Sequence, residues 1–83
     1  MIAFQFNHNG QTYDAEFVRG QIEYDRSTVA AYLGLDPAQL PDRVSAVRAP
    51  VVIPPEKLSQ FREWHAAAQE TVFTLIKADN EYD

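Results

Sequence analysis

The dipeptide Asn9-Gly10 constrains the fold of this chain more than any other feature. A two-residue type I′ turn needs a positive φ at both positions, which asparagine and glycine tolerate. Apolar and polar residues alternate on either side of the dipeptide, in Ile2–Phe6 and in Tyr13–Phe17. The sequence therefore predicts a β-hairpin that reverses at Asn9-Gly10.

The side-chain alternation selects the register of this hairpin. Folding at the turn brings apolar residues together on one face, whereas a slip of one residue would move all of them into water. The predicted apolar pairs are Phe6 with Tyr13, Phe4 with Ala15, and Ile2 with Phe17.

A second reversal is predicted at Arg19-Gly20, because Gln21–Tyr24 resumes the same alternation. A simple two-residue turn places Phe17 opposite Ile22 and extends the apolar face to a third strand. A bulge at the glycine is the alternative, since arginine is a poor first residue of a type I′ turn. The bulge would bring Glu23 to the core side, so we favour the simple turn.

The middle of the chain carries weaker signals. Thr28–Leu33 is predicted as a short helix that Gly34 ends, and Asp36-Pro37 begins a single further turn. The Val-rich segment Val44–Ile53 is predicted to be extended. Because Pro50 cannot donate to a ladder, this segment is expected to be an edge strand or an ordered loop.

The longest predicted element is an amphipathic helix from about Pro55 to Lys77. Its apolar residues recur at spacings of three and four: Leu58, Phe61, His65, Ala68, Val72 and Leu75. Such a helix measures about 34 Å, whereas a six-residue strand spans about 20 Å, so one end must overhang the sheet. Either the short helix covers that end, or its apolar residues meet a second chain in a homodimer. The residues proposed for that contact are Val72, Phe73 and Ile76.

These elements predict one α+β domain over residues 1–83. A small antiparallel sheet, a three-stranded meander with a further edge strand, packs on one face against the long C-terminal helix, with a short helix between. Residues 79–83 are expected to form a frayed acidic tail.

Charge and composition exclude several classes of function. The net charge of −5 argues against a general nucleic-acid or anionic-membrane binder, since both need a cationic surface. The chain has no cysteine, which removes disulfides and thiolate zinc sites. It shows no signal-peptide pattern and no apolar run near the roughly 20 residues of a membrane helix. We therefore expect a soluble cytoplasmic protein.

The predicted register gathers four acidic residues on the sheet face away from the core: Asp14, Glu16, Glu23 and Asp25. Glu16 falls opposite Glu23, and Asp14 opposite Asp25. Like charges across a strand pair are destabilising, so folding alone does not favour this arrangement. The acids are then either a solvated face screened by Arg19 and Arg26, or a docking patch for a basic partner. A hard-metal site is disfavoured, because a flat sheet wraps an ion poorly.

No catalytic apparatus is visible in the sequence. The two histidines, His8 and His65, lack the spacing of zinc ligands. The serines lack a nucleophile elbow, and a chain with three glycines has no glycine-rich phosphate loop. We therefore expect no enzyme activity, no metal and no cofactor.

The segment Thr28–Leu35 resembles the first helix and turn of helix-turn-helix proteins. Ala30, Gly34 and Leu40 match the small residue, turn glycine and later apolar position of that pattern. The resemblance implies a DNA-binding regulator that would use residues 28–43. The would-be recognition helix, however, is cut off by Pro41 after about one turn.

The sequence thus favours a small, acidic, non-catalytic protein that binds another protein through Asp14, Glu16, Glu23 and Asp25. The expected partner has a basic surface. By analogy, the chain could be a phage-type or mobile-element-type inhibitor that presents carboxylates where nucleic-acid phosphates would sit. The helix-turn-helix regulator is the alternative.

Overall fold

Both predicted chain reversals are present, in the predicted registers. Strands β1 (Ile2–His8) and β2 (Gln11–Val18) pair over seven residues each, from Ile2 with Phe17 to His8 with Gln11. The turn residues have the positive φ angles of a type I′ turn, 52° at Asn9 and 81° at Gly10. The alternation of the first seventeen residues is therefore sufficient to fix the hairpin.

The second turn is the simple one, without a bulge. Val18 pairs with Gln21, so Arg19 and Gly20 are the only residues between β2 and β3 (Gln21–Asp25). Arg19 adopts a φ of 53°, in the left-handed region that favours glycine or asparagine. The apolar pattern of β3 thus determines the register, although the first turn residue is unfavourable.

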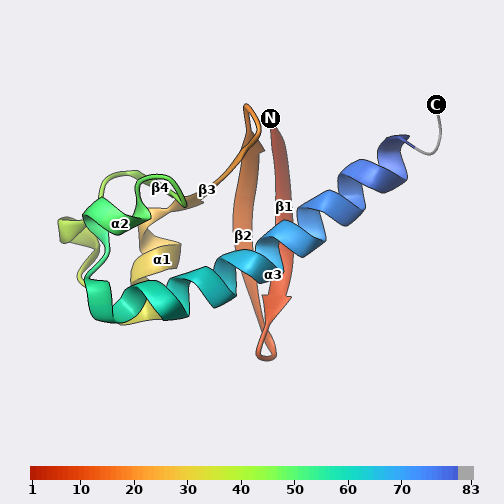
Figure 1. Ribbon diagram of the computed structural model, residues 1–83. Helices are drawn as coiled ribbons and strands as arrows, with labels where there is room; N and C mark the ends of the chain where they lie inside the picture. Colours follow the sequence, from red (N-terminus) through yellow and green to blue (C-terminus); the bar gives the residue numbers. More distant parts are fainter. Residues whose placement is uncertain (81–83) are drawn as a thin grey trace.

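The computed structural model describes residues 1–80 and shows an α+β fold in two layers (Figure 1). The four strands form an antiparallel sheet in the order β1-β2-β3-β4. One face of the sheet packs against the long C-terminal helix, as predicted. The remaining elements follow β3 in the chain: α1 (Arg26–Leu33), the 3-10 turn η1 (Pro37–Gln39), β4 (Arg43–Ser45), α2 (Ala49–Val52) and α3 (Pro55–Asn80).

Helix α1 begins two residues before the predicted start. Asp25 occupies the N-cap position, but its side chain makes no capping hydrogen bond. Gly34 ends the helix in the left-handed conformation, as expected, with φ 70°. Asp36 caps the following single turn, because its Oδ1 accepts the backbone N–H of Ala38 at 3.0 Å.

The prediction of an extended segment over Val44–Ile53 was wrong for most of its length. Only Val44 and Ser45 belong to β4, which pairs with β3, and α2 follows after a turn. Pro50 lies in the first turn of α2, where a missing N–H costs no helical hydrogen bond. A four-residue helix is too short for a 3.6-residue period to be recognised, so the valines favoured a strand.

The core is centred on Trp64 of α3, which is fully buried. Tyr32 of α1 stacks on the indole at 5.0 Å with an interplanar angle of 12°. The other rings around it come from the sheet and from α3 itself: Phe6, Tyr13, Tyr24 and Phe61. These aromatic contacts join the sheet to both helices.

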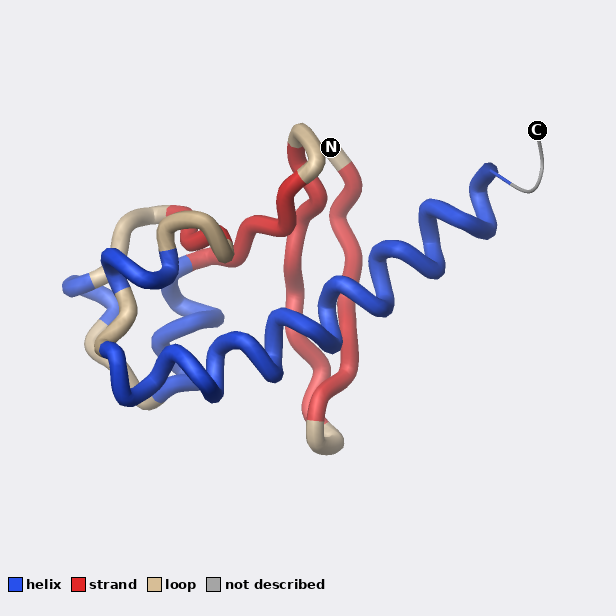
Figure 2. Tube along the Cα trace, in the orientation of Figure 1, coloured by secondary structure: helices blue, strands red, loops and turns tan. Residues whose placement is uncertain are grey.

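Helix α3 overhangs the sheet at its C-terminal end. The helix crosses the hairpin and continues beyond β1, while α1 and α2 lie beside its N-terminal half (Figures 1 and 2). Helix α1 therefore does not cover the overhang. Coverage by this short helix was one of the two expectations from the sequence. The helix extends through Asn80, beyond the predicted end at Lys77, and residues 81–83 of the predicted tail lie outside the described residues.

Candidate functional site

The outer face of the sheet brings the four predicted acids around one shallow depression of about 300 Å³. Asp14 and Glu16 come from β2, and Glu23 and Asp25 come from β3. Glu16 and Glu23 are direct cross-strand partners, as the register predicted. Two carboxylates on opposed Cα positions repel one another, so this pair opposes folding.

The predicted pairing of Asp14 with Asp25 was wrong. The β2–β3 ladder ends at Glu16 and Glu23, and β3 then turns away to pair with β4. Asp25 consequently lies opposite Arg43 of β4. Asp14 and Asp25 still line the same depression, from its two sides.

Arg43 completes the site and was missed in the sequence. Its Nη2 lies 2.9 Å from Glu16 Oε1 and its Nη1 lies 3.5 Å from Asp25 Oδ1. The Glu16 carboxylate raises the pKa of the Arg43 guanidinium above its ordinary value. Four carboxylates around one guanidinium leave a formal charge of −3 on the face. The arginine thus neutralises only part of the acidic cluster.

A cross-strand hydrogen bond extends this face to β1. Gln5 Nε2 donates a hydrogen bond to Asp14 Oδ1 at 2.8 Å, so one oxygen of that carboxylate has a partner within the sheet. The depression is also lined by Ala3 of the same strand. The resulting surface is a shallow depression lined by residues of all four strands.

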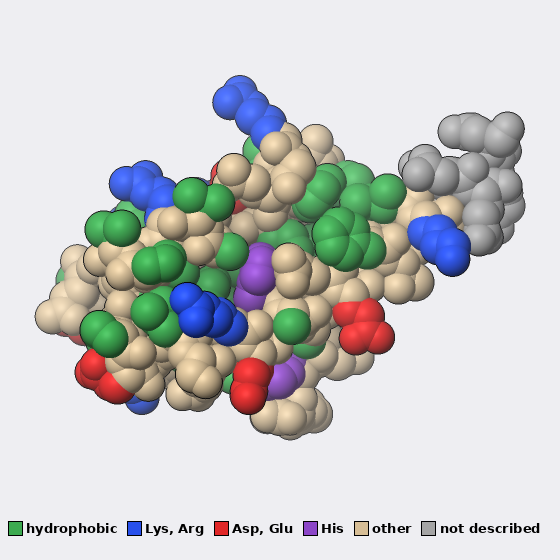
Figure 3. Space-filling view, viewed as in Figure 1, with side chains coloured by type: hydrophobic (Ala, Val, Ile, Leu, Met, Phe, Trp, Pro, Cys, Tyr) green, Lys and Arg blue, Asp and Glu red, His purple; other side chains and the backbone are tan. Residues whose placement is uncertain are grey.

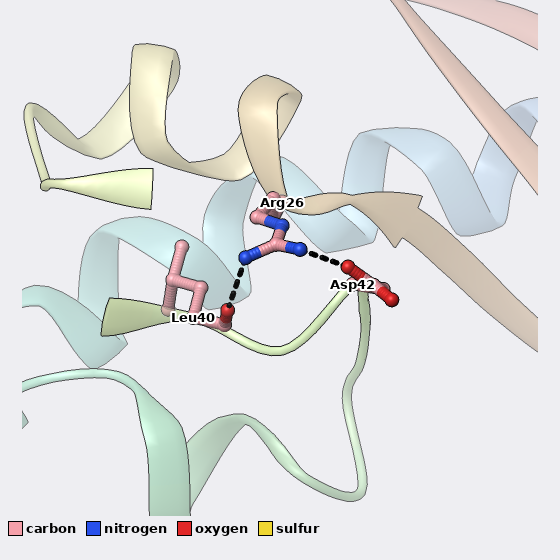
Figure 4. Close-up of polar contacts among 3 residues, drawn as sticks. All are labelled: Arg26, Leu40 and Asp42. Atoms are coloured by element: carbon pink, nitrogen blue, oxygen red, sulfur yellow. Dashed lines mark hydrogen bonds and ion pairs between the residues drawn. The ribbon is translucent and has the colours of Figure 1, made fainter. Parts of the chain in front are cut away.

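The two arginines expected to screen the acids behave differently. Arg26 is bound within a neighbouring loop: its guanidinium contacts the Asp42 carboxylate and donates to the Leu40 carbonyl oxygen at 3.4 Å (Figure 4). The Arg26 backbone N–H also donates to the Asp42 carbonyl oxygen at 3.2 Å. These bonds fix the loop that leads into β4 and thereby position Arg43. Arg19 is exposed at the β2–β3 turn.

The two histidines make contacts of different kinds. His65 Nδ1 lies 2.6 Å from the hydroxyl oxygen of the fully buried Tyr24. Burial raises the pKa of Tyr24 and lowers the pKa of His65, so the neutral forms of both side chains are favoured in this hydrogen bond. His8 lies beside the first turn, with its ring against Tyr32. Among residues 1–80, no three side chains of metal-ligating type come together.

The residues proposed as a homodimer contact lie at the end of α3, and their exposure differs. Val72 is fully buried within the monomer and is not available to a second chain. Phe73 is 56% exposed, and Ile76 is partly buried. Hydrophobic side chains gather on this part of the helix-covered face (Figure 3).

The segment that resembles a helix-turn-helix motif forms only its first part. Helix α1 and the Gly34 cap match the pattern, but residues 35–48 hold one 3-10 turn and the short strand β4. No second helix follows the turn at the position of a recognition helix in this described segment.

No family model, curated protein or solved structure matches this chain. No helix in the described part of the chain is both long and apolar enough to span a bilayer. The outer acidic face is defined by Asp14, Glu16, Glu23, Asp25 and Arg43.

Proposed function

We propose that this chain is a non-catalytic protein that binds another protein through its outer acidic face. The observation that carries the proposal is the directly opposed pair Glu16 and Glu23. These two like charges repel one another across the strand pair, and the ion pairs of Arg43 go to Glu16 and Asp25. A partner that supplies cations would relieve the repulsion.

The charge and shape of the face indicate the kind of partner. A formal charge of −3 on a shallow, open face complements a basic protein surface, and such complementarity accelerates association. The face is too shallow to enclose a small molecule. In the more specific version of the proposal, the partner is a nucleic-acid-binding protein whose phosphate sites the carboxylates occupy, as a phage-type or mobile-element-type inhibitor would do.

The test is affinity capture from the source organism with two charge-matched variants. In the face variant Asp14→Asn/Glu23→Gln, both ion pairs of Arg43 are left in place. The control Glu63→Gln/Glu70→Gln removes the same charge from exposed positions of α3. We expect a protein with a basic surface to be retained by the wild type and the control and lost by the face variant. Retention by all three proteins would refute the proposal.

A further inference from the structure

The sheet ends at β1, a strand with none of the features that usually protect an edge. Exposed edges are commonly blunted by charge, proline, a bulge or short length. Strand β1 is seven residues long, contains no Lys, Arg, Asp, Glu or Pro, and pairs with β2 one to one without a bulge. The opposite edge, β4, has only three residues. Within residues 1–80, the sheet therefore has one long edge without acidic or basic residues other than His8, in a protein of net charge −5.

The hairpin geometry determines which backbone groups this edge presents. The residues that flank a two-residue turn form a hydrogen-bonded pair, here His8 and Gln11. Hydrogen-bonded and non-hydrogen-bonded pairs alternate along an antiparallel ladder. The N–H and C=O groups of Ala3, Gln5 and Asn7 therefore point away from β2, toward the next strand position.

Helix α3 extends over that next strand position. Leu75 and Ile76 follow the buried Val72 by one helical turn and continue its sheet-facing stripe. Leu75 is nonetheless 46% exposed, because the helix has passed the edge of the sheet (Figure 2). An open cavity of about 490 Å³ lies at this end, lined by Ile2, Phe17, Leu75 and Ile76. Helix α3 therefore extends over the position that one further strand beside β1 would occupy.

We propose that a second copy of this chain supplies the missing strand, by antiparallel pairing of the two β1 strands across a two-fold axis at Gln5. In this register Ala3 faces Asn7 of the second copy and Gln5 faces Gln5. The outward-pointing N–H and C=O groups of all three residues then form hydrogen bonds across the axis. Pairing odd positions with odd positions also keeps both core faces on the same side of the joined sheet. The overhanging end of each α3 then lies over the edge of the other copy.

Apolar side chains are exposed at this edge. Met1 is 87% exposed, Ile2 is 42% exposed and Leu75 is 46% exposed. Pairing of two copies would cover these side chains, which favours association. Because β1 carries no acidic or basic residue other than His8, two acidic chains can meet there without opposed like charges.

The test is sedimentation equilibrium of the wild type and two charge variants. We expect a dimer at tens of micromolar protein, and we expect Gln5→Lys to weaken association at least about tenfold, because two cations would face each other across the axis. Gln5 is exposed and beside Asp14, so the monomer tolerates the change. Gln11→Lys adds the same charge to β2, away from the edge, and should leave the dimer intact.

A cross-link identifies the register in the same experiment. The chain contains no cysteine, so Gln5→Cys introduces a single thiol that can react only with its copy. A hydrogen-bonded antiparallel pair has Cα atoms about 5.5 Å apart, within the range of a disulfide. Mild oxidation should produce a covalent dimer of Gln5→Cys and not of Gln11→Cys. A monomer at all concentrations, or a dimer unaffected by Gln5→Lys, would overturn the proposal without bearing on the acidic face.

Discussion

Replacement of Trp64 by alanine is expected to lower the free energy of unfolding by about 3–5 kcal/mol. The indole is fully buried and contacts rings from the sheet, from α1 and from α3, so its loss leaves a cavity where the two layers meet. Small domains have a total stability of only about 5–15 kcal/mol, and this change removes much of it. Urea denaturation followed by far-UV circular dichroism is the appropriate measurement, because Trp64 is the only tryptophan.

The variant Trp64→Phe serves as a matched comparison. The indole Nε1 is buried, and no atom of the described residues accepts its hydrogen bond. Phenylalanine therefore removes an unsatisfied N–H while keeping most of the ring contacts, and it should cost less than half as much as alanine. If alanine and phenylalanine were equally destabilising, the aromatic cluster would not be the centre of the core.

Acidification is expected to destabilise the protein through His65. Burial lowers the pKa of this imidazole in the folded protein, and its Nδ1 lies within hydrogen-bond distance of the buried Tyr24 hydroxyl. The unfolded chain, with a histidine pKa of about 6.5, therefore binds more protons as the pH falls below that value. Stability should decrease from about pH 6.5 downward, by up to about 1.4 kcal/mol per pH unit, until the folded imidazole protonates.

The variant His65→Gln separates this effect from other titrations. Glutamine can also form a hydrogen bond with Tyr24 but does not titrate, so the slope of unfolding free energy between pH 7.5 and 5.5 should be shallower than in the wild type. Equal slopes for the two proteins would show that His65 does not couple folding to pH.

The first three strands and the long helix could be predicted because several signals agree there. In the first hairpin, the turn residues Asn9 and Gly10 and the apolar alternation specify the same register. In α3, the recurrence of apolar residues over many turns outweighs any single position. The exact partner of Trp64 could not be foreseen, since ring stacking with Tyr32 depends on how α1 returns to the sheet.

Arg43 is the one residue of the outer acidic face that was not predicted from the sequence. Arg43 lies at the start of a three-residue strand, too short to carry a period of two. Its neighbour Pro41 suggests a loop, and the valines after it suggest a longer strand than exists. The arginine reaches Glu16 only because β3 leaves β2 and pairs with β4. The opposite charges of Asp25 and Arg43 favour a cross-strand pair, and they were the available indication of this pairing.

A docking role for the outer acidic face implies that its acids are present at a cost to folding. The most direct measurement is the free energy of unfolding of Glu23→Gln at low salt, beside Glu70→Gln as a control on α3. Removing the charge opposite Glu16 should stabilise the isolated protein by a few tenths to about 1 kcal/mol, and the gain should shrink at high salt. A loss of stability in Glu23→Gln that the control does not share would contradict the account, because the sheet itself would then need the carboxylate.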